Sequence, residues 1–200
     1  MATAAFVLIA YLIGSLSFAV LVSRAFGLPD PHSYGSGNPG ATNVLRTGKK
    51  TAALLTLLGD GGKGWIAVFL AQRYAADWGV GETGIAGVVI AVFIGHLFPV
   101  LFRFKGGKGV ATAAGILTAV DPWLGLAALA CWIVVAAVFR YSSLAALVAS
   151  VFASIFYLWF FGAGVMAAAV VAMSLLLVWR HEDNLRRLLA GHEVRIGGKK

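Results

Sequence analysis

The sequence predicts an all-α integral membrane protein, and three observations support that fold class. First, 60% of the 200 residues are hydrophobic, 12% are charged and the mean hydropathy is +0.88, whereas soluble domains carry about 25% charged residues. Second, the apolar residues form blocks near the ~20 residues that a helix needs to cross a bilayer. Third, basic residues gather in alternate connections between these blocks. No long polar stretch remains for a second domain, so we expect one membrane domain.

The apolar blocks predict seven transmembrane helices, some of them short. Asp121-Pro122 divides one long apolar stretch, because a proline disfavours helical backbone at the residue before it. Six helices are the alternative, because the fourth segment is short. The expected segments are 4–23, 51–72, 83–102, 109–120, 122–139, 143–161 and 163–179.

The Lys and Arg residues predict the orientation of the chain. With a periplasmic N-terminus and a cytoplasmic C-terminus, 14 of the 16 basic residues fall on the inner side and Arg73 lies outside. This asymmetry follows the positive-inside rule and favours an odd number of helices. The N-terminus lacks a signal-peptide pattern, so it is expected to be an uncleaved first helix. The inner basic residues are Arg24, Arg46, Lys49, Lys50, Arg103, Lys105, Lys108, Arg140, Arg180, Arg186, Arg187, Arg195, Lys199 and Lys200.

Two inner loops are dense in glycine and polar groups. The segment 34–46 reads YGSGNPGATNVLR, and its backbone N–H groups, hydroxyls, amides and Arg46 suit an anion. The segment 104–112 reads FKGGKGVAT, which brings Lys108 to the N-terminus of the fourth helix, where the helix dipole also favours anions. It lacks the Walker A spacing. The alternatives are a flexible loop for the first segment and a basic membrane anchor for the second.

Other polar residues are expected at the same inner face. The segment 180–191 predicts a helix that continues out of the last span and ends at Gly191; a plain amphipathic tail is the alternative. Asp60 and Lys63 lie in the second span, where ionisable residues are costly. We expect them to complete a polar site near its inner end, and a purely structural pair is the alternative. Ser143 could cap the sixth helix or face the inner layer.

Three further residues carry less information. His96 is expected to be a satisfied structural histidine. His32 gives no usable signal. The single cysteine, Cys131, lies in an apolar run and is expected to be a small buried core residue. No cluster of His, Cys or carboxylates has metal spacing, so no metal is expected.

Five stretches, in this order along the chain, resemble bacterial acylphosphate:glycerol-3-phosphate acyltransferases, the membrane PlsY family. They run through nearly the whole chain, and two of them are long and specific. The resemblance implies a single membrane-embedded acyltransferase domain, 1–200, in the bacterial inner membrane with its site on the cytoplasmic face. The stretches are GSGNPGATNVLR (35–46), Asp60-x-x-Lys63-Gly64, GH-x-FP (95–99), F-x-GGKGVAT (104–112) and RH-x-x-N-x-x-RLL-x-G (180–191).

The resemblance also implies a reaction. A fatty acyl chain passes from acyl phosphate to sn-glycerol 3-phosphate, giving lysophosphatidic acid and inorganic phosphate in the first acylation of phospholipid synthesis. The family uses no cofactor, metal, acyl-CoA or acyl carrier protein. Acyl phosphate has a good leaving group, so positioning matters more than a strong nucleophile. No Ser-His-Asp order or H-x-x-x-x-D signature is evident, so we expect direct attack without an acyl-enzyme.

Residue roles follow from the match to the family motifs. The expected catalytic residues are Lys108, His181, Asn184 and Arg46. Lys108 and the loop 36–43 are expected to hold acyl phosphate, while Arg46, His181, Asn184 and Ser143 hold glycerol 3-phosphate. The base is open between His181 and a substrate phosphate oxygen. The expected substrate-binding residues are Ser36, Gly37, Asn38, Thr42, Asn43, Gly106, Gly107, Gly109 and Ser143, with Asp60 and Lys63 supporting them.

Two other functions compete with this interpretation. A transporter or flippase for an anionic metabolite would need polar residues through the whole membrane depth, and the outer half of this chain has few. A regulatory subunit that senses anionic lipid explains the basic tail but not the two loops. The expected partners are acyl phosphate, glycerol 3-phosphate and membrane lipid, with no nucleic acid. Contact with the enzyme that makes acyl phosphate is compatible with this function, although no residue argues for it.

Overall fold

A computed structural model describes residues 1–198, and that part of the chain consists of helices and loops without a strand. The all-α expectation is therefore confirmed for the described residues. Lys199 and Lys200, two of the basic residues assigned to the inner side, lie outside them. The helices are α1 (Ala2–Gly14), α2 (Phe18–Ala25), α3 (Ala41–Leu45), α4 (Lys50–Tyr74), η1 (Ala75–Trp78), α5 (Glu82–Leu97), η2 (Val100–Phe102), α6 (Val110–Val120), α7 (Pro122–Phe139), α8 (Ser142–Phe161), α9 (Val165–Arg180) and α10 (Glu182–Leu189).

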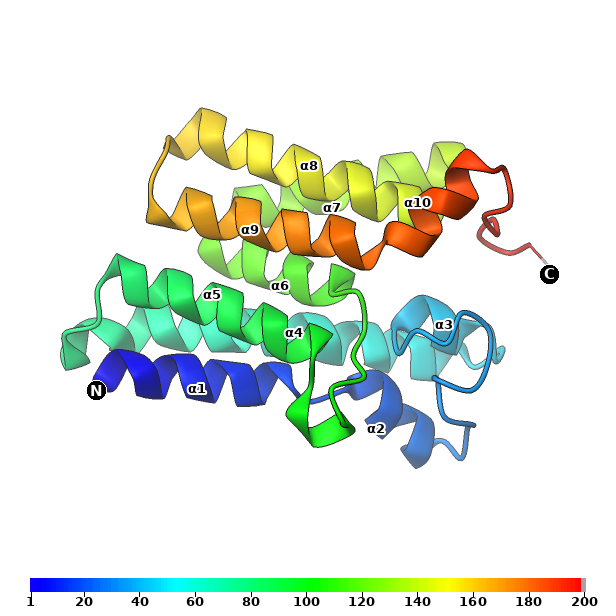
Figure 1. The fold of residues 1–200 in the computed structure, drawn as a ribbon, viewed down its shortest axis with the longest axis horizontal. Helices are drawn as coiled ribbons and strands as arrows, with labels where there is room; N and C mark the ends of the chain where they lie inside the picture. The colour runs from blue at the N-terminus through cyan, green and yellow to red at the C-terminus, as the bar shows by residue number, and fades with distance from the viewer. Residues whose placement is uncertain (199–200) are drawn as a thin grey trace.

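The long helices run side by side in two groups (Figure 1). One group contains α1, α4 and α5, and the other contains α7, α8 and α9. Helix α6 lies between them and packs on both α4 and α7. The N-terminus lies at one end of the long axis, whereas α3, α10 and the C-terminal segment lie at the other (Figure 1). The loop 34–46 lies at this end, and its Pro39 carbonyl lies close to Gly107, so the structure brings the two loops singled out in the sequence together.

Four helical segments are long and apolar enough to cross a membrane, or up to six if each of two bent helix pairs counts as one span. Helix α6 is apolar, but its 11 residues reach only about 16 Å at ~1.5 Å per residue, well short of a ~30 Å hydrocarbon core. The helices occur where the seven segments were expected, with two differences in continuity.

The first expected segment, 4–23, is not one helix. Helices α1 and α2 are separated by three residues and bent by 40°. The break frees the carbonyl of Leu16, which accepts a hydrogen bond from Lys63 Nζ at 2.5 Å. The C-terminal segment also differs from the continuous helix that was expected, because α9 and α10 are bent by 59° at His181. The bend lets the side chain of Asn184 become buried against the rest of the molecule.

Glycines allow the closest helix contacts. A Cβ atom at Gly14 would collide with the backbone of Val92, which joins α1 to α5. A Cβ atom at Gly115 would collide with the carbonyl of Gly61, which joins α6 to α4. Small residues are the usual means of close helix packing in membranes. Helix α4 stays continuous through its glycine pair, Gly61-Gly62, because α6 packs directly against it.

Cys131 differs from the expected core residue. Helix α7 buries one narrow face, formed by Leu124, Gly125, Ala128 and Ala136. Cys131 lies outside that face and is half-buried. An apolar run predicts buried side chains, but α7 is a peripheral helix, so most of its apolar side chains are exposed.

Candidate active site

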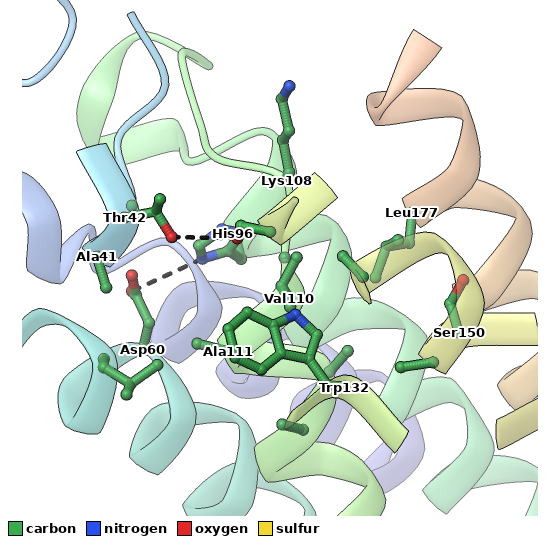
Figure 2. A pocket seen from close by; sticks show the side chains of 18 of the residues that line it. Ala41, Thr42, Asp60, His96, Lys108, Val110, Ala111, Trp132, Ser150 and Leu177 are labelled. Carbon is green, nitrogen blue, oxygen red and sulfur yellow. Dashed lines mark hydrogen bonds and ion pairs between the residues drawn. The ribbon is translucent and has the colours of Figure 1, made fainter. Parts of the chain in front are cut away.

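A cavity of about 440 Å³ opens at the end of the molecule that carries α3 and α10. The polar residues Thr42 and Lys108 line it (Figure 2), and so does Asn38. Leu117, two turns along α6 from Val110 at the start of the helix, lies about 10 Å farther along it at ~1.5 Å per residue. The apolar walls are completed by Leu54, Leu57, Leu129, Trp132 and Leu177. The cavity therefore combines a polar mouth with an apolar interior, which suits an amphiphilic anion.

The turn 106–109 is fixed by close packing against the end of α5. Side chains at Gly106 or Gly107 would collide with the backbone of His96 or approach its ring. Gly107 N donates to the carbonyl of His96 at 3.2 Å. Arg180 donates from Nη2 to the Gly106 carbonyl at 3.2 Å and from Nε to the Gly107 carbonyl at 3.3 Å. These glycines were expected to admit an anion, but packing against α5 already requires them.

The turn also starts α6 as the sequence predicts. Gly109 is the N-cap residue and has a φ of 83°, a value that glycine adopts without strain. A Cβ atom at this position would collide with the ring of Phe93, so a larger residue does not fit. The first N–H groups of α6 and the ammonium of Lys108 thus lie at one side of the cavity, which both Lys108 and Gly109 line.

Lys108 belongs to a hydrogen-bonded network that joins three elements. Its Nζ contacts Oδ1 of Asn184 on α10. Asn184 Nδ2 donates to Glu193 Oε1 at 2.6 Å, and Ser143 Oγ on α8 donates to the same oxygen at 2.6 Å. Arg187 Nε donates to Glu193 Oε2 at 2.8 Å. Three residues expected at the site, Lys108, Ser143 and Asn184, are therefore brought together through Glu193.

Burial and this network shift two pKa values. Burial, and secondarily the positive charge of Arg187, lowers the pKa of Lys108. Partial burial of Glu193 opposes ionisation, but the hydrogen bonds from Ser143, Arg187 and Asn184 outweigh it and hold the pKa of this carboxyl below its usual value. Lys108 is therefore a weakly solvated cation, whose attraction for an anion is stronger than in bulk water.

The loop 34–46 divides into an anchored part and a part that lines the cavity. The buried amide of Asn43 donates to the carbonyls of Pro31 (2.8 Å) and Tyr34 (3.2 Å), and accepts from Ser36 N (3.0 Å) and Arg46 Nη1 (3.4 Å). These four bonds use the whole capacity of an amide. Asn43 thus holds the loop together, and neither it nor Ser36, Gly37 or Arg46 lines the cavity.

The cavity-lining part of this loop contacts α8. Thr42 Oγ1 lies 3.4 Å from Ser142 Oγ, and both residues line the cavity. Ser142 is therefore a site residue that the sequence reasoning missed. Ser143 was expected to cap α8, but this is wrong because Tyr141 occupies the N-cap position and Ser143 is inside the helix. Its hydroxyl binds Glu193 instead.

A second polar network lies buried beneath the turn. Lys63 Nζ lies 2.8 Å from Asp60 Oδ1, and His96 Nδ1 lies 3.7 Å from the same oxygen. Thr112 Oγ1 donates to the carbonyl of Asp60 at 3.0 Å and lies 3.1 Å from His96 Nδ1. Asp60 and His96 reach the cavity wall (Figure 2). The expected site residues Asp60 and Lys63 are thus an ion pair, and Asp60 alone of the two touches the cavity.

His181 lies buried at the bend between α9 and α10. Its Nδ1 lies 2.8 Å from the carbonyl of Leu177, which can only accept, so Nδ1 carries the proton in this bond. In the neutral ring, Nε2 is then free to accept a proton. Leu177 lines the cavity, whereas His181, one helical turn farther along, does not.

Comparison with known proteins gives consistent matches over the full chain. A family model described as Glycerol-3-phosphate acyltransferase matches residues 4–191. Proteins named glycerol-3-phosphate acyltransferase from Cupriavidus necator and Ralstonia pickettii are 64% and 66% identical, covering 100% of this chain and 99% and 96% of theirs. Crystal structures of PlsY (YgiH), an integral membrane glycerol 3-phosphate acyltransferase, in glycerol 3-phosphate and lysophosphatidic acid forms, are 34% identical. Both cover 98% of this chain and 96% and 95% of theirs, with TM-scores of 0.91 and 0.89.

Proposed function

The chain belongs to the glycerol-3-phosphate acyltransferase family, and we propose that it transfers a fatty acyl group from acyl phosphate to sn-glycerol 3-phosphate. The products are lysophosphatidic acid and inorganic phosphate, and the reaction is the first acylation of phospholipid synthesis. The glycerol 3-phosphate and lysophosphatidic acid forms of the similar PlsY structures support the acceptor and the product. Residues 1–200 act as one membrane-embedded acyltransferase domain.

The shape of the cavity carries the proposal. Lys108 and Thr42 lie at a mouth that also receives the N-terminus of α6, and the walls below are apolar. A phosphate at the mouth with an acyl chain along the walls places both ends of acyl phosphate in matching surroundings. A thioester donor carries no phosphate next to its reacting carbonyl, so it would bring no anion to the half-buried ammonium of Lys108, which the described part of the protein pairs only with the neutral amide of Asn184 at hydrogen-bond distance.

The proposed reaction is a single displacement at the acyl carbon. A hydroxyl oxygen of glycerol 3-phosphate bonds to the carbonyl carbon, and the bond from that carbon to the phosphate oxygen breaks. Inorganic phosphate leaves with the electron pair. The hydroxyl proton passes either to His181 Nε2 or to a phosphate oxygen. Lys108 and the N–H groups of α6 stabilise the charge on the departing phosphate.

The other expected residues act around this centre. Asn38 and Thr42 bind acyl phosphate from the cavity wall, together with Lys108 and Gly109, while Gly106 and Gly107 hold the turn against α5. Asn184 and Ser143 bind glycerol 3-phosphate and are oriented by Glu193. Arg46 is exposed and approaches the second phosphate from outside the cavity. Ser36, Gly37 and Asn43 keep the loop in shape.

We further propose that seven membrane segments arrange this site on the cytoplasmic face of the bacterial inner membrane, with a periplasmic N-terminus. The segments are α1 with α2, α4, α5, the short α6, α7, α8, and α9 with α10. The excess of Lys and Arg at the end that carries the two loops supports this orientation. Cysteine accessibility at Trp78 and at Ile196, replaced in separate variants, tests it, because only the former should react from the periplasm.

Acyl transfer by the purified protein tests the reaction. Palmitoyl phosphate is supplied with and without glycerol 3-phosphate, and palmitoyl-CoA is supplied as the alternative donor. We expect lysophosphatidate and phosphate in equal amounts only when both phosphates are present, and no product from the thioester. Equal turnover of palmitoyl-CoA would contradict the donor assignment. Absence of transfer from either donor, by folded protein, would contradict the enzyme and favour transport.

A further inference from the structure

A second cavity, of about 350 Å³, is lined in part by the segment that leads to the turn 106–109, and it shares no lining residue with the first. It is formed by α2, the loop that follows α2, and the segment 101–105. Three cationic side chains and one carboxylate line it. The lining residues are Val20, Arg24, Asp30, His32, Leu101, Phe102, Arg103 and Lys105.

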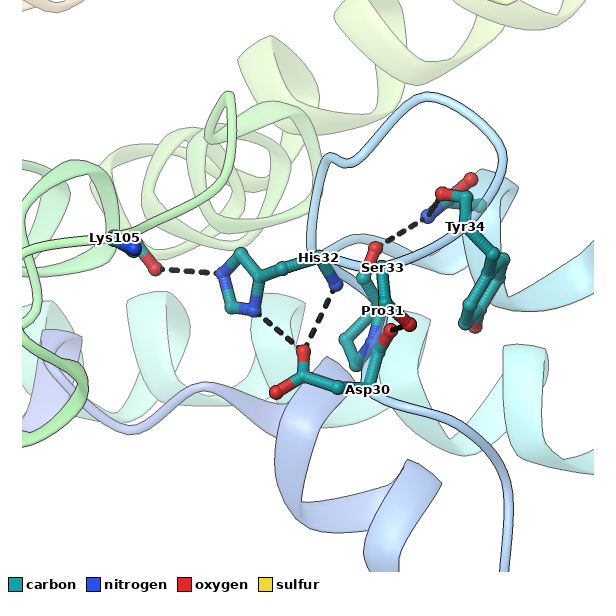
Figure 3. A network of polar contacts seen from close by, with 7 residues as sticks. Asp30, Pro31, His32, Ser33, Tyr34 and Lys105 are labelled. Atoms are coloured by element: carbon teal, nitrogen blue, oxygen red, sulfur yellow. Dashed lines mark hydrogen bonds and ion pairs between the residues drawn. The ribbon is translucent and has the colours of Figure 1, made fainter.

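The carboxylate of this cavity is hydrogen-bonded to His32 and is also attracted by the charge of Arg24, whereas the three cations are not hydrogen-bonded in the part of the chain that the structure describes. Asp30 Oδ1 lies 2.6 Å from His32 Nδ1 and accepts from His32 N at 2.9 Å (Figure 3). Within residues 1–198, the side chains of Arg24, Arg103 and Lys105 make no hydrogen bond and no ion pair. By contrast, Arg180 and Arg187 at the candidate active site are bonded to protein groups. The second cavity is therefore a concave surface with a net positive charge, formed by three cationic side chains and one carboxylate.

The backbone that presents two of these cations is strained. Arg103 and Phe104 have φ values of 54° and 60°, in the left-handed region that non-glycine residues rarely adopt. A hydrogen bond from Phe104 N to the Pro99 carbonyl, at 2.9 Å, closes this turn. Such strain persists only where the surroundings over-determine the conformation, and it concentrates at binding sites.

Exposed apolar side chains surround the cavity. Leu101 is 58% exposed, and its neighbour Phe104 is 59% exposed. On the α2 side, Leu21 and Phe26 are 40% and 41% exposed. In an integral membrane protein, a belt of exposed apolar groups beside free cations suits a ligand with an anionic head and an acyl tail. A free phosphate would use only the cations.

We propose that this cavity binds the phosphate headgroup of an anionic membrane lipid. Arg24 and Arg103 offer guanidinium groups to the phosphate, and Lys105 adds an ammonium. Leu101 and Phe104 contact the acyl chains at the membrane surface. The site lies outside the acyl-transfer cavity and takes a lipid as a bound component of the protein rather than as a substrate.

The lipid site is joined to the turn of the candidate active site. His32 Nε2 lies 3.1 Å from the Lys105 carbonyl (Figure 3), and Lys105 directly precedes the packed Gly106. His32 also precedes the loop that Asn43 anchors. A bound headgroup would offset the repulsion among the three cations and so steady the segment that carries Lys108.

Lipid binding is tested on the full chain in mild detergent by native mass spectrometry. Dioleoyl phosphatidylglycerol is titrated against dioleoyl phosphatidylcholine, which has the same chains and no net charge. The test variant is Arg24→Gln with Arg103→Gln. The matched control is Lys49→Gln with Arg73→Gln, which removes the same charge away from this cavity. A third arm adds inorganic phosphate in equimolar amount to the anionic lipid.

We expect the native chain and the control to prefer phosphatidylglycerol by about tenfold, the value of one charge-assisted contact, and the test variant to lose this preference. Inorganic phosphate should not displace the lipid. An equal loss in the control would overturn the site in favour of general charge attraction. Displacement by phosphate would overturn the lipid assignment. If the double variant does not fold, Arg24→Gln alone should still lower the preference, and an unchanged preference would overturn the proposal.

Discussion

Two polar networks meet at the turn 106–109, where Gly107 packs on His96 beside Lys108, and they differ in what they contact. The network of Lys108, Asn184 and Glu193 borders an open cavity mouth and ties loose segments to the helices. The network of Asp60, Lys63 and His96 is buried and joins α4 to α5 and the broken first segment. The difference teaches that ionisable residues in one membrane protein can serve a ligand or serve the fold, depending on whether the charged group is partly exposed at a cavity or is buried and paired with another charge.

The largest effect is expected in the buried network. Replacing Asp60 by Leu leaves the ammonium of Lys63 buried without its carboxylate, which should destabilise the fold by about 3–5 kcal/mol. Reversible unfolding in mixed micelles measures this. The double variant Asp60→Leu with Lys63→Met should regain most of the stability, because it removes both charges. A stable but inactive Asp60→Leu would instead place this network in the chemistry.

The next largest effect is expected at the cavity mouth. Replacing Lys108 by Gln removes the ammonium that offsets charge on the departing phosphate, so kcat should fall by about 10²–10³ while unfolding stays unchanged. Steady-state rates with palmitoyl phosphate measure the effect. Lys49→Gln removes a nearby charge that lines no cavity and should keep full activity. Half or more of the native rate in the Lys108 variant would contradict its role.

A smaller effect is expected at Glu193, which orients rather than reacts. The Glu193→Gln variant replaces one acceptor oxygen with a donor that faces Ser143, Asn184 or Arg187. Loss of about one charge-assisted bond should lower kcat/KM for glycerol 3-phosphate about tenfold. KM for acyl phosphate should hardly change. An equal rise of both KM values would mean that Glu193 supports the whole fold instead.

The ionisation of Glu193 predicts how this network depends on pH. Because the folded pKa of the carboxyl is held below its usual value of 4.5, ionisation stabilises the folded network at all pH values above 4.5. That contribution is lost as pH falls through the lower folded value. A fluorophore attached at residue 196 should report release of the C-terminal segment only in that acid range, and the Glu193→Gln variant should not show this transition. Release near neutral pH would contradict the assignment.

The smallest effect is expected at Ser142. Its 3.4 Å contact with Thr42 is long and partly exposed, so the Ser142→Ala variant should lose about 0.5 kcal/mol, or about twofold in kcat/KM. Initial rates at low acyl phosphate measure it. A loss comparable with that of Lys108→Gln would show that the hydroxyl acts on a substrate rather than on the loop.

Local pattern predicted much of the fold and the location of the candidate site. Apolar block lengths located the helices, and the sequence Gly-Gly-Lys-Gly before an apolar run predicted the N-terminus of α6. Charge asymmetry assigned the loops 34–46 and 104–112 to one face, and the structure brings the two loops together at Pro39 and Gly107. These features depend on neighbours in the chain, which is why the sequence carries them.

The remaining features depend on contacts between distant segments. The break at Leu16 is coupled to Lys63, 47 residues away, and no local signal marks that pairing. Glu193 meets Ser143 across 50 residues, although Glu193 follows the last quoted motif by only two positions. His32 has one local partner, Asp30, but its link to the segment before the turn 106–109 goes to the Lys105 carbonyl, which belongs to the backbone. A hydrogen bond to a main-chain carbonyl does not depend on which residue carries that carbonyl, so the sequence does not reveal it.

The accessibility of Lys108 tests most directly whether a phosphate occupies the cavity mouth. Its lowered pKa makes it a stronger nucleophile at neutral pH than an ordinary lysine. Amine labelling followed by mass spectrometry compares Lys108 with Lys49, with and without a non-transferable palmitoyl phosphonate. The phosphonate should slow labelling of Lys108 by about tenfold, as expected for a site held at ~90% occupancy, and should leave Lys49 unchanged. Equal labelling of Lys108 with and without saturating phosphonate would contradict a substrate site at this mouth.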